Sequence, residues 1–320
     1  MASELAPDKY PNSPVFGVVR PSCDPKSGVF GGERDSNLSD SPIITDSILR
    51  AVRELNGGGD TMRHNDDAAV GGVVFSVELE LAIDRPALHR QQRLDRLSGE
   101  LIGLFERHQL PATWAVADPA RSAATAAIAA SAQRHEVAVL GESSWLGRGA
   151  GRIRIERELA RRVGGARQAG IAVTTLLMRN DSEPLDLDLL LGQQISAVSY
   201  SGMASPPGQR SGERHFGVWH APAAWRLPLA PRWWQPIRWQ AARRLWQAAR
   251  GQRIEHVAID GDALVDQGER GLAQIAAIVE LAARLRAERR LSVRTLAEIA
   301  AENLAHRFPQ PAKSALAAAA

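Results

Sequence analysis

The sequence predicts an α/β fold in which parallel strands alternate with helices, and three observations support this class. Short apolar runs rich in β-branched residues recur along the chain. The segments between these runs repeat their apolar residues at helical spacing. Glycine and proline separate the two kinds of segment. Such alternation is typical of βαβ units assembled into a single sheet or barrel.

The first predicted strand, residues 73–80, is the reference for the rest of the chain. Its apolar run ends in two carboxylates, Glu78 and Glu80. Because ligands of α/β folds bind at the carboxyl ends of the strands, Ser76, Glu78 and Glu80 are the first candidates for a site. The alternative is that both glutamates simply face solvent beyond a buried strand.

The remaining elements follow in alternation. A helix is expected to begin near Pro86 and to end before Pro111, with leucine and phenylalanine at helical spacing between them. Further strands are expected at residues 112–116, 136–140, 171–178, 195–199, 216–220, 225–229 and 254–260. Further helices are expected at residues 119–134, around 155–163, 185–191, 237–250 and 271–289, with loops at 141–151 and 202–213, and residues 292–306 close the domain.

The two ends of the chain differ from its centre. Residues 1–70 scatter proline, glycine, serine and aspartate without a sustained period of 2 or 3.6, apart from a short amphipathic piece at 44–55. We therefore expect a mostly disordered leader, one folded domain over residues 71–307, and a flexible alanine-rich tail over residues 308–320.

Composition excludes several classes of protein. A hydrophobic content of 44% and a charged content of 23% are ordinary for a soluble globular protein. The net charge is +3, and the 39 basic and 36 acidic residues alternate along helices, so nucleic-acid binding is not indicated. The single cysteine, Cys23, excludes an intramolecular disulfide framework and a cysteine-rich zinc site. No apolar run resembles a signal peptide or a membrane span, so we expect a cytoplasmic protein.

Tryptophan is concentrated in one region of the chain. These side chains could stack on the faces of sugar rings, or they could pack in the core or at an interface. Trp239 and Trp246 lie seven residues apart on one predicted helix, which favours packing for those two. Six of the eight tryptophans lie here: Trp219, Trp225, Trp233, Trp234, Trp239 and Trp246.

Several short phrases resemble the motifs of a known family. The first strand contains Phe75-Ser76-Val77-Glu78, residues 110–116 read Leu-Pro-Ala-Thr-Trp-Ala-Val, and residues 135–144 begin with His-Glu-Val. Gly170-Ile171, Arg179 at a strand end and His256 in the closing strand follow in order. In order and spacing these segments resemble the polysaccharide deacetylase family, whose members contain the NodB homology domain. The resemblance spans about residues 72–300 and implies a distorted (β/α)7 barrel.

The resemblance implies metal-dependent hydrolysis of an acetyl group on a sugar polymer. In the family one carboxylate and two histidines four residues apart hold the metal, an aspartate is the general base and a later histidine is the acid. Here the base position falls on Ser76, and the two histidine positions fall on Leu140 and Ser144. A hydroxyl is not a base at neutral pH unaided, and leucine has no ligand atom. No bound metal or other cofactor is therefore expected.

Other candidate residues each have two interpretations. Arg179 could bind a substrate carboxylate or form a salt bridge with Glu78. His256 lies in an apolar strand, so a satisfied core histidine is favoured over a catalytic acid. Asp260-Gly261-Asp262 stands where the family has its later histidine element, and a turn is favoured over a cation site. The predicted binding cleft comprises Ser76, Glu78, Glu142, Ser144, Arg179, Asp260 and Asp262.

Three functions are consistent with the sequence. The first is a catalytically inactive deacetylase homologue that binds a carbohydrate or a protein partner in polysaccharide metabolism. The second is an active deacetylase using Glu78, Arg179, His256 and Asp260, with Glu142 joining Glu78, His256 and Asp260 around a harder cation such as magnesium. The third is a scaffold that docks through residues 1–70 and the tryptophan region.

Overall fold

The computed structural model describes residues 71–81, 88–147, 149–179, 185–200, 214–215, 217–221, 224–227, 237–251 and 253–307. The predicted leader (residues 1–70), tail (308–320) and loop (202–213) lie outside the described residues, so those predictions stay predictions. None of the described helices is long and apolar enough to span a membrane.

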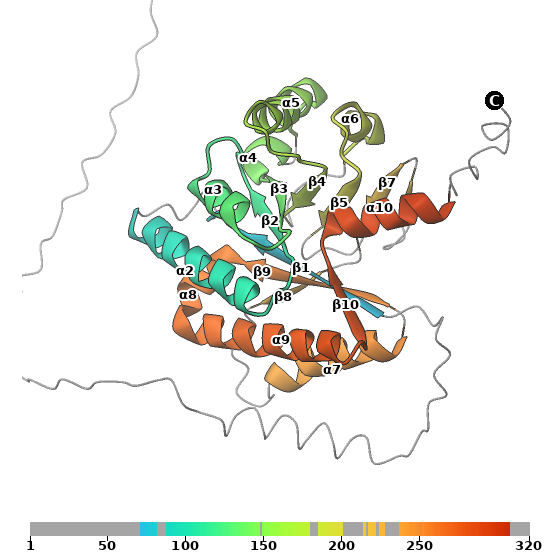
Figure 1. The fold of residues 1–320 in the computed structure, drawn as a ribbon. Helices are drawn as coiled ribbons and strands as arrows, with labels where there is room; N and C mark the ends of the chain where they lie inside the picture. Colours follow the sequence, from blue (N-terminus) through green and yellow to red (C-terminus); the bar gives the residue numbers. More distant parts are fainter. Residues whose placement is uncertain are drawn as a thin grey trace, which may run out of the picture. The chain divides into compact units, whose positions relative to one another are not determined.

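One mostly parallel sheet organises the described residues (Figure 1). Its strands are β1 (Gly71–Glu78), β2 (Thr113–Val116), β3 (Glu136–Gly141), β4 (Thr175–Met178), β5 (Ala197–Tyr200), β6 (Arg214–His215), β7 (Val218–His220), β8 (Trp225–Leu227), β9 (Ile254–Asp260) and β10 (Leu291–Arg294). The order is β6-β7-β5-β4-β3-β2-β1-β9-β8, and β10 pairs with β1 beside this path. Every described pair is parallel except β6 with β7.

Helices connect the strands, as expected for βαβ units. They are α2 (Leu88–Arg107), α3 (Ala123–Ala130), α4 (Ser143–Leu146), α5 (Arg152–Gln168), α6 (Leu187–Gly192), α7 (Ile237–Gly251), α8 (Gly261–Gln267), α9 (Glu269–Ala287) and α10 (Leu296–Arg307). In Figure 1, α2, α7, α8 and α9 lie on one side of the β1–β9 part of the sheet, and α3 to α6 lie beyond β2 to β4.

Strand β1 is the centre of the sheet, and every one of its residues is buried. It pairs with β9 along almost its whole length. On its other edge, β10 pairs with the first half of β1 and β2 pairs with the second half. A central strand with partners along both edges holds Ser76 and Glu78 in fixed positions, because each of these residues is in register with a residue of β2 and of β9.

The two faces of β1 contact different parts of the core. Val73, Phe75 and Val77 belong to the largest hydrophobic cluster, which includes residues of α2, α7 and α9. Val74 faces the opposite way and joins a cluster with residues of β2 to β5 and of α10. Since side chains alternate along a strand, Ser76 and Glu78 share the face of Val74, which we call the inner face.

The inner face is curved into a barrel-like wall. Ser199 of β5 is hydrogen-bonded to His256 of β9 at 3.2 Å, although four strands separate β5 from β9 in the sheet order. A flat sheet would place these residues far apart, since neighbouring strands are about 4.8 Å from one another. Leu296, Ile299 and Ala300 of α10 fill part of the enclosed space. The inner face therefore surrounds a packed interior.

Most predicted elements are confirmed, but the bounds of two strands were wrong: the strand expected at 73–80 is Gly71–Glu78, and the strand expected at 171–178 is only Thr175–Met178. Five further details were wrong or missed. The expected helix at 119–134 is shorter (α3), and the expected loop at 141–151 contains α4. The turn expected at Asp260-Gly261-Asp262 is instead the start of α8. Strand β10 and the two-residue β6 were not predicted. All five are short or depend on tertiary pairing, so they produce little periodicity in the sequence.

The described tryptophans pack within the protein. Trp219 is buried in the inner-face cluster, and Trp225 belongs to the largest cluster. The Arg290 guanidinium lies 4.3 Å from the ring centroid of Trp246, which packs against the same large cluster. Packing is thus confirmed for Trp246, whereas the side chain of Trp239 lies outside the described part of the chain.

Candidate functional site

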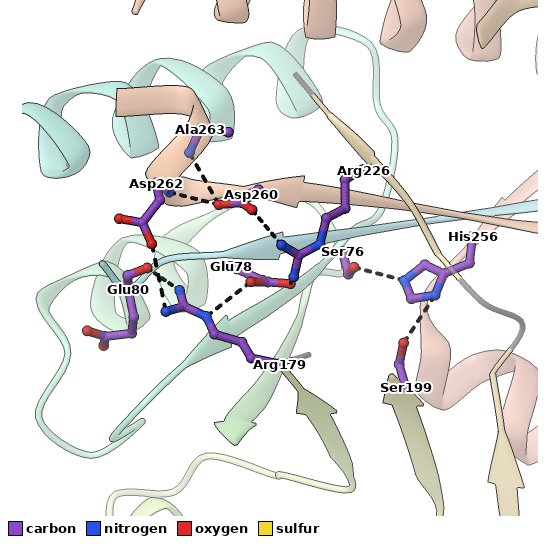
Figure 2. Close-up of polar contacts among 10 residues, drawn as sticks. All are labelled: Ser76, Glu78, Glu80, Arg179, Ser199, Arg226, His256, Asp260, Asp262 and Ala263. Atoms are coloured by element: carbon purple, nitrogen blue, oxygen red, sulfur yellow. Dashed lines mark hydrogen bonds and ion pairs between the residues drawn. The ribbon is translucent and has the colours of Figure 1, made fainter. Parts of the chain in front are cut away.

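A group of charged side chains lies at the carboxyl ends of the strands, and we call it the strand-end cluster (Figure 2). Its members are Glu78 of β1, Arg179 directly after β4, Arg226 of β8, Asp260 of β9 and Asp262 of α8. Parallel strands place their carboxyl ends at one edge of a sheet, which is why residues so distant in sequence meet here.

Glu78 is the buried centre of the strand-end cluster. Its side chain is 1% exposed. Arg179 Nε donates to Glu78 Oε2 at 3.2 Å, and Arg226 Nη2 donates to Glu78 Oε1 at 3.5 Å. Burial of a carboxylate is costly unless opposite charges and hydrogen bonds compensate it. Both oxygens of Glu78 thus face a guanidinium group, and the salt bridge expected between Arg179 and Glu78 is present.

The carboxylate of Asp260 accepts three hydrogen bonds, one from a side chain of β8 and two from the backbone of α8. Its Oδ2 accepts a hydrogen bond from Arg226 Nη1 at 2.7 Å. Its Oδ1 accepts from the backbone N–H groups of Asp262 and Ala263, at 3.0 and 3.2 Å, and so caps the N-terminus of α8. Asp260 therefore links β8 to α8.

Asp262 lies between Arg179 and a further arginine, Arg90. Its Oδ2 is 3.9 Å from Arg179 Nη1, and its Oδ1 is 3.5 Å from Arg90 Nη2. Arg179 also donates to the backbone carbonyl of Glu80. The strand-end cluster is consequently a continuous network of alternating positive and negative groups.

Arg226 is the functional residue that the sequence reasoning missed. It stands between Trp225 and Leu227 in β8, and both of these neighbours are buried. A charged residue at the centre of a short apolar strand, on the face opposite its apolar neighbours, was the available signal. Its partner Glu78 lies 148 positions earlier in the sequence, so no local pattern could identify the pair.

Next to the strand-end cluster, a chain of three polar side chains crosses the inner face. Ser76 Oγ is hydrogen-bonded to His256 Nε2 at 2.8 Å, and Ser199 Oγ to His256 Nδ1 at 3.2 Å. A serine beside an imidazole is also how a nucleophile contacts its base. Here all three side chains are fully buried, so a substrate has no access to Ser76. His256 is the satisfied core histidine that the sequence favoured.

The two positions that correspond to the family's metal-binding histidines are Leu140 and Ser144, and neither has an imidazole. Leu140 is fully buried in the inner-face cluster. Ser144 Oγ donates to Glu142 Oε2 at 3.0 Å in the segment after β3. The structure thus brings Ser76 to His256, and Glu78 to Arg179 and the network around Asp260, while Glu142 and Ser144 bond to each other.

Glu80 lies two residues beyond the end of β1. Burial raises the pKa of its carboxyl group, and this effect exceeds the opposing effect of the hydrogen bond that the backbone N–H of Ala117 donates to Oε1 at 3.1 Å. The nearby Glu142 carboxylate raises the pKa further. Glu80 is therefore in a different electrostatic environment from Glu78.

The residues at the strand ends do not fit a divalent metal ion. Glu78 and Asp260 are bound by guanidinium groups, which would repel a cation placed between them. Across the part of the chain that the structure describes, no group of three or more histidine, cysteine, aspartate or glutamate side chains could hold a metal. The four side chains of the magnesium hypothesis, Glu78, Glu142, His256 and Asp260, do not form such a group.

No model of a protein family matches the sequence, and no curated protein matches it. A solved structure from Mycobacterium smegmatis, assigned as a polysaccharide deacetylase, is similar in structure. The identity is 16%, the match covers 75% of this chain and 93% of the other chain, and the TM-score is 0.54.

The chain has the polysaccharide deacetylase fold. The predicted α/β fold class, a distorted (β/α)7 barrel of the deacetylase type, is therefore confirmed. A second structure assigned to the same activity, from Pseudomonas aeruginosa PAO1, has 11% identity, covers 74% of this chain and 91% of its own, and has a TM-score of 0.47. At these identities the likeness establishes the deacetylase fold alone.

Proposed function

We propose that this chain is a catalytically inactive homologue of the polysaccharide deacetylases, with a carbohydrate- or partner-binding role in polysaccharide metabolism. The observation that supports this most strongly is the state of Glu78. Both of its carboxylate oxygens face guanidinium groups, at 3.2 and 3.5 Å, and its side chain is buried. A carboxylate whose charge is balanced by two guanidinium groups is a poor ligand for a metal ion and a poor base toward water.

The neighbouring residues support the same proposal. Hydrolysis of an amide or ester requires a base that activates water and an electrophile that stabilises the oxyanion. Ser76 occupies the base position of the family, and its hydroxyl is buried against His256. Leu140 occupies a metal-ligand position and is packed among apolar side chains. We infer that binding was retained in this chain and hydrolysis was not.

Carbohydrate is the ligand that we favour. The similar structure from M. smegmatis is assigned as a polysaccharide deacetylase. If this chain lost hydrolysis but kept binding, a polysaccharide is the ligand that requires no change of ligand class. Docking of a protein through residues 1–70 and the tryptophan region stays a separate prediction. Deletion of residues 1–70, followed by a pull-down, would test it.

Acetate release provides the direct test. The full chain, with zinc, cobalt or magnesium added in turn, is incubated with acetylated chito-oligosaccharides and peptidoglycan fragments. We expect no acetate above a heat-treated control, and no stoichiometric metal in the purified protein by mass spectrometry. Binding of the same oligosaccharides is measured by calorimetry. Acetate release that is abolished by chelation, and by Glu78→Gln in a variant shown by circular dichroism to be folded, would overturn the proposal.

A matched variant shows whether any acetate release comes from this protein or from a contaminating enzyme. Glu100→Gln changes an exposed carboxylate on α2 that is paired only with Arg96 at 3.4 Å among the described residues. It should leave any acetate release unchanged. If Glu78→Gln leaves a measured rate as unchanged as Glu100→Gln does, that rate arises from a contaminating enzyme.

A further inference from the structure

A cavity of about 310 Å³ lies next to the strand-end cluster, and no member of that cluster lines it. Its walls come from the segments after β1 and β2 and from the helices α2 and α3. Ligand sites of α/β folds lie in this position, at the carboxyl ends of the strands. The volume is at the lower end of the range for small-molecule sites, which is about 300–1,000 Å³, and is enough for one sugar ring.

Three carboxylates, Glu80, Asp95 and Asp118, and the guanidinium group of Arg121 line the cavity. Asp118 accepts from Arg161 Nη1 at 2.8 Å and lies 4.0 Å from Arg121 Nε. Among the described residues, Glu80 Oε1 accepts the backbone N–H of Ala117, and Arg179 donates to the carbonyl of Glu80 and not to its carboxylate. The charges of Arg179 and Arg162 nevertheless act on this carboxyl group and lower its pKa in part. Asp95 Oδ1 accepts from Gln91 Nε2 at 2.9 Å, and Gln91 also lines the cavity. Within the described ranges, neither Glu80 nor Asp95 forms an ion pair. Both can accept hydrogen bonds from a ligand.

Ser122 provides a hydroxyl group that makes no helix-capping hydrogen bond among the described residues. This residue is the N-cap of α3 and lines the cavity. Serine at this position usually accepts from the first turn of its helix. The Ser122 hydroxyl can therefore donate to a ligand or accept from it. Ala123 and Ala124 beside it provide apolar surface for the C–H groups of a ring.

We propose that this cavity binds one neutral pyranose ring of the carbohydrate, an inference that rests on the proposed function and locates its ligand. Sugar hydroxyls donate and accept, which matches a cavity lined by carboxylate, amide and hydroxyl groups. An acidic sugar is disfavoured, since among the described lining residues three carboxylates outnumber the one guanidinium group, that of Arg121. The ligand then binds beside the barrel axis, where the strand-end cluster does not block it.

Calorimetry with the full chain tests the site. The probes are cellotriose and tri-N-acetylchitotriose, which are neutral, and trigalacturonic acid, which is acidic. Ala123→Trp places a large side chain in the cavity from an exposed position on α3. Ala129→Trp makes the same change at an exposed position of the same helix outside the cavity, and serves as the control. Asp95→Ala removes an acceptor, with Glu100→Ala as its control on α2.

We expect at least one neutral trisaccharide to bind the wild type and the Ala129→Trp and Glu100→Ala variants equally. Ala123→Trp and Asp95→Ala should weaken that binding at least tenfold, and trigalacturonic acid should bind at least tenfold more weakly than the neutral probe. If the wild type binds but Ala123→Trp binds equally well, the sugar is elsewhere, which overturns the cavity and leaves the proposed function intact. If no probe binds the wild type, the carbohydrate proposal fails and the cavity proposal fails with it.

Discussion

Glu78 and Glu80 stand two residues apart at the end of the same strand, yet their surroundings are opposite. Two guanidinium groups bind Glu78, whereas the carboxylate of Glu80 accepts one backbone N–H among the described residues and borders a cavity. Spacing in the sequence does not distinguish them. The difference comes from the strands and helices that meet each side chain, and it decides which carboxylate is available to a ligand.

The largest expected effect is on the Glu78 side of this comparison. Arg179→Met leaves the buried Glu78 with Arg226 as its remaining guanidinium partner among the described residues, so we expect a loss of about 3 kcal/mol of unfolding free energy in urea titrations. A double-mutant cycle checks the cause. Glu78→Gln together with Arg179→Met should cost clearly less than the sum of the two single changes. Additive costs would mean that the two side chains are not coupled.

The approach of α8 to β1 is the next most sensitive feature. A Cβ atom at Gly261 would lie 2.4 Å from the backbone oxygen of Glu78 and 3.3 Å from Leu94 Cδ1. Gly261→Ala should therefore lower the unfolding free energy by about 2 kcal/mol, measured by thermal or urea unfolding. Gly99→Ala is the control, because no atom lies within 4 Å of its added Cβ and it is on an exposed helix face. That change should stabilise the protein slightly.

A smaller effect is expected in the buried polar chain. Ser199→Ala removes the hydroxyl that is 3.2 Å from His256 Nδ1 and leaves the other ring nitrogen bonded to Ser76. We expect a loss of about 1 kcal/mol in unfolding free energy. The comparison is with Ser98→Ala, whose hydroxyl donates to the carbonyl of Leu94 within its own helix. If Ser199→Ala costs less than Ser98→Ala, the bond across the barrel does not contribute to stability.

The smallest effect on the unfolding free energy is expected at Glu80, where the substitution should stabilise the protein and not destabilise it. Burial raises the pKa of its carboxyl group in the folded state above the ordinary value of 4.5. The folded state then binds more protons than the unfolded state between the two pKa values, so ionisation of Glu80 lowers stability as the pH rises through that window. Glu80→Gln removes this term and keeps an acceptor for the Ala117 N–H. Unfolding free energies across pH 4 to 7 should fall less steeply in the variant than in the wild type.

Several elements show how far sequence reasoning reached. The strand at residues 254–260 was predicted with the bounds that the structure has, because Val257, Ala258 and Ile259 form an apolar run and Asp260 and Gly261 mark its end. The leucines placed at helical spacing, Leu94, Leu97, Leu101 and Leu104 of α2, are buried, whereas Leu88 at the start of the helix is exposed. In contrast, Asp260 was assigned to a turn, since the same residue types that form turns also cap helices. Local chemistry identified a boundary there but did not reveal that a helix begins at it.

The sequence by itself determined the α/β class, the succession of strands along the chain, and the presence of serine and leucine where the related family has a base and metal ligands. Those features depend on residue type and periodicity, which are local. Only the tertiary structure decided that Arg226 and Arg179 bind Glu78, that Ser199 reaches His256 across the barrel, and that Glu80 borders a cavity. These contacts join residues far apart in the chain, and their geometry is set by how the sheet curves and how its strands align.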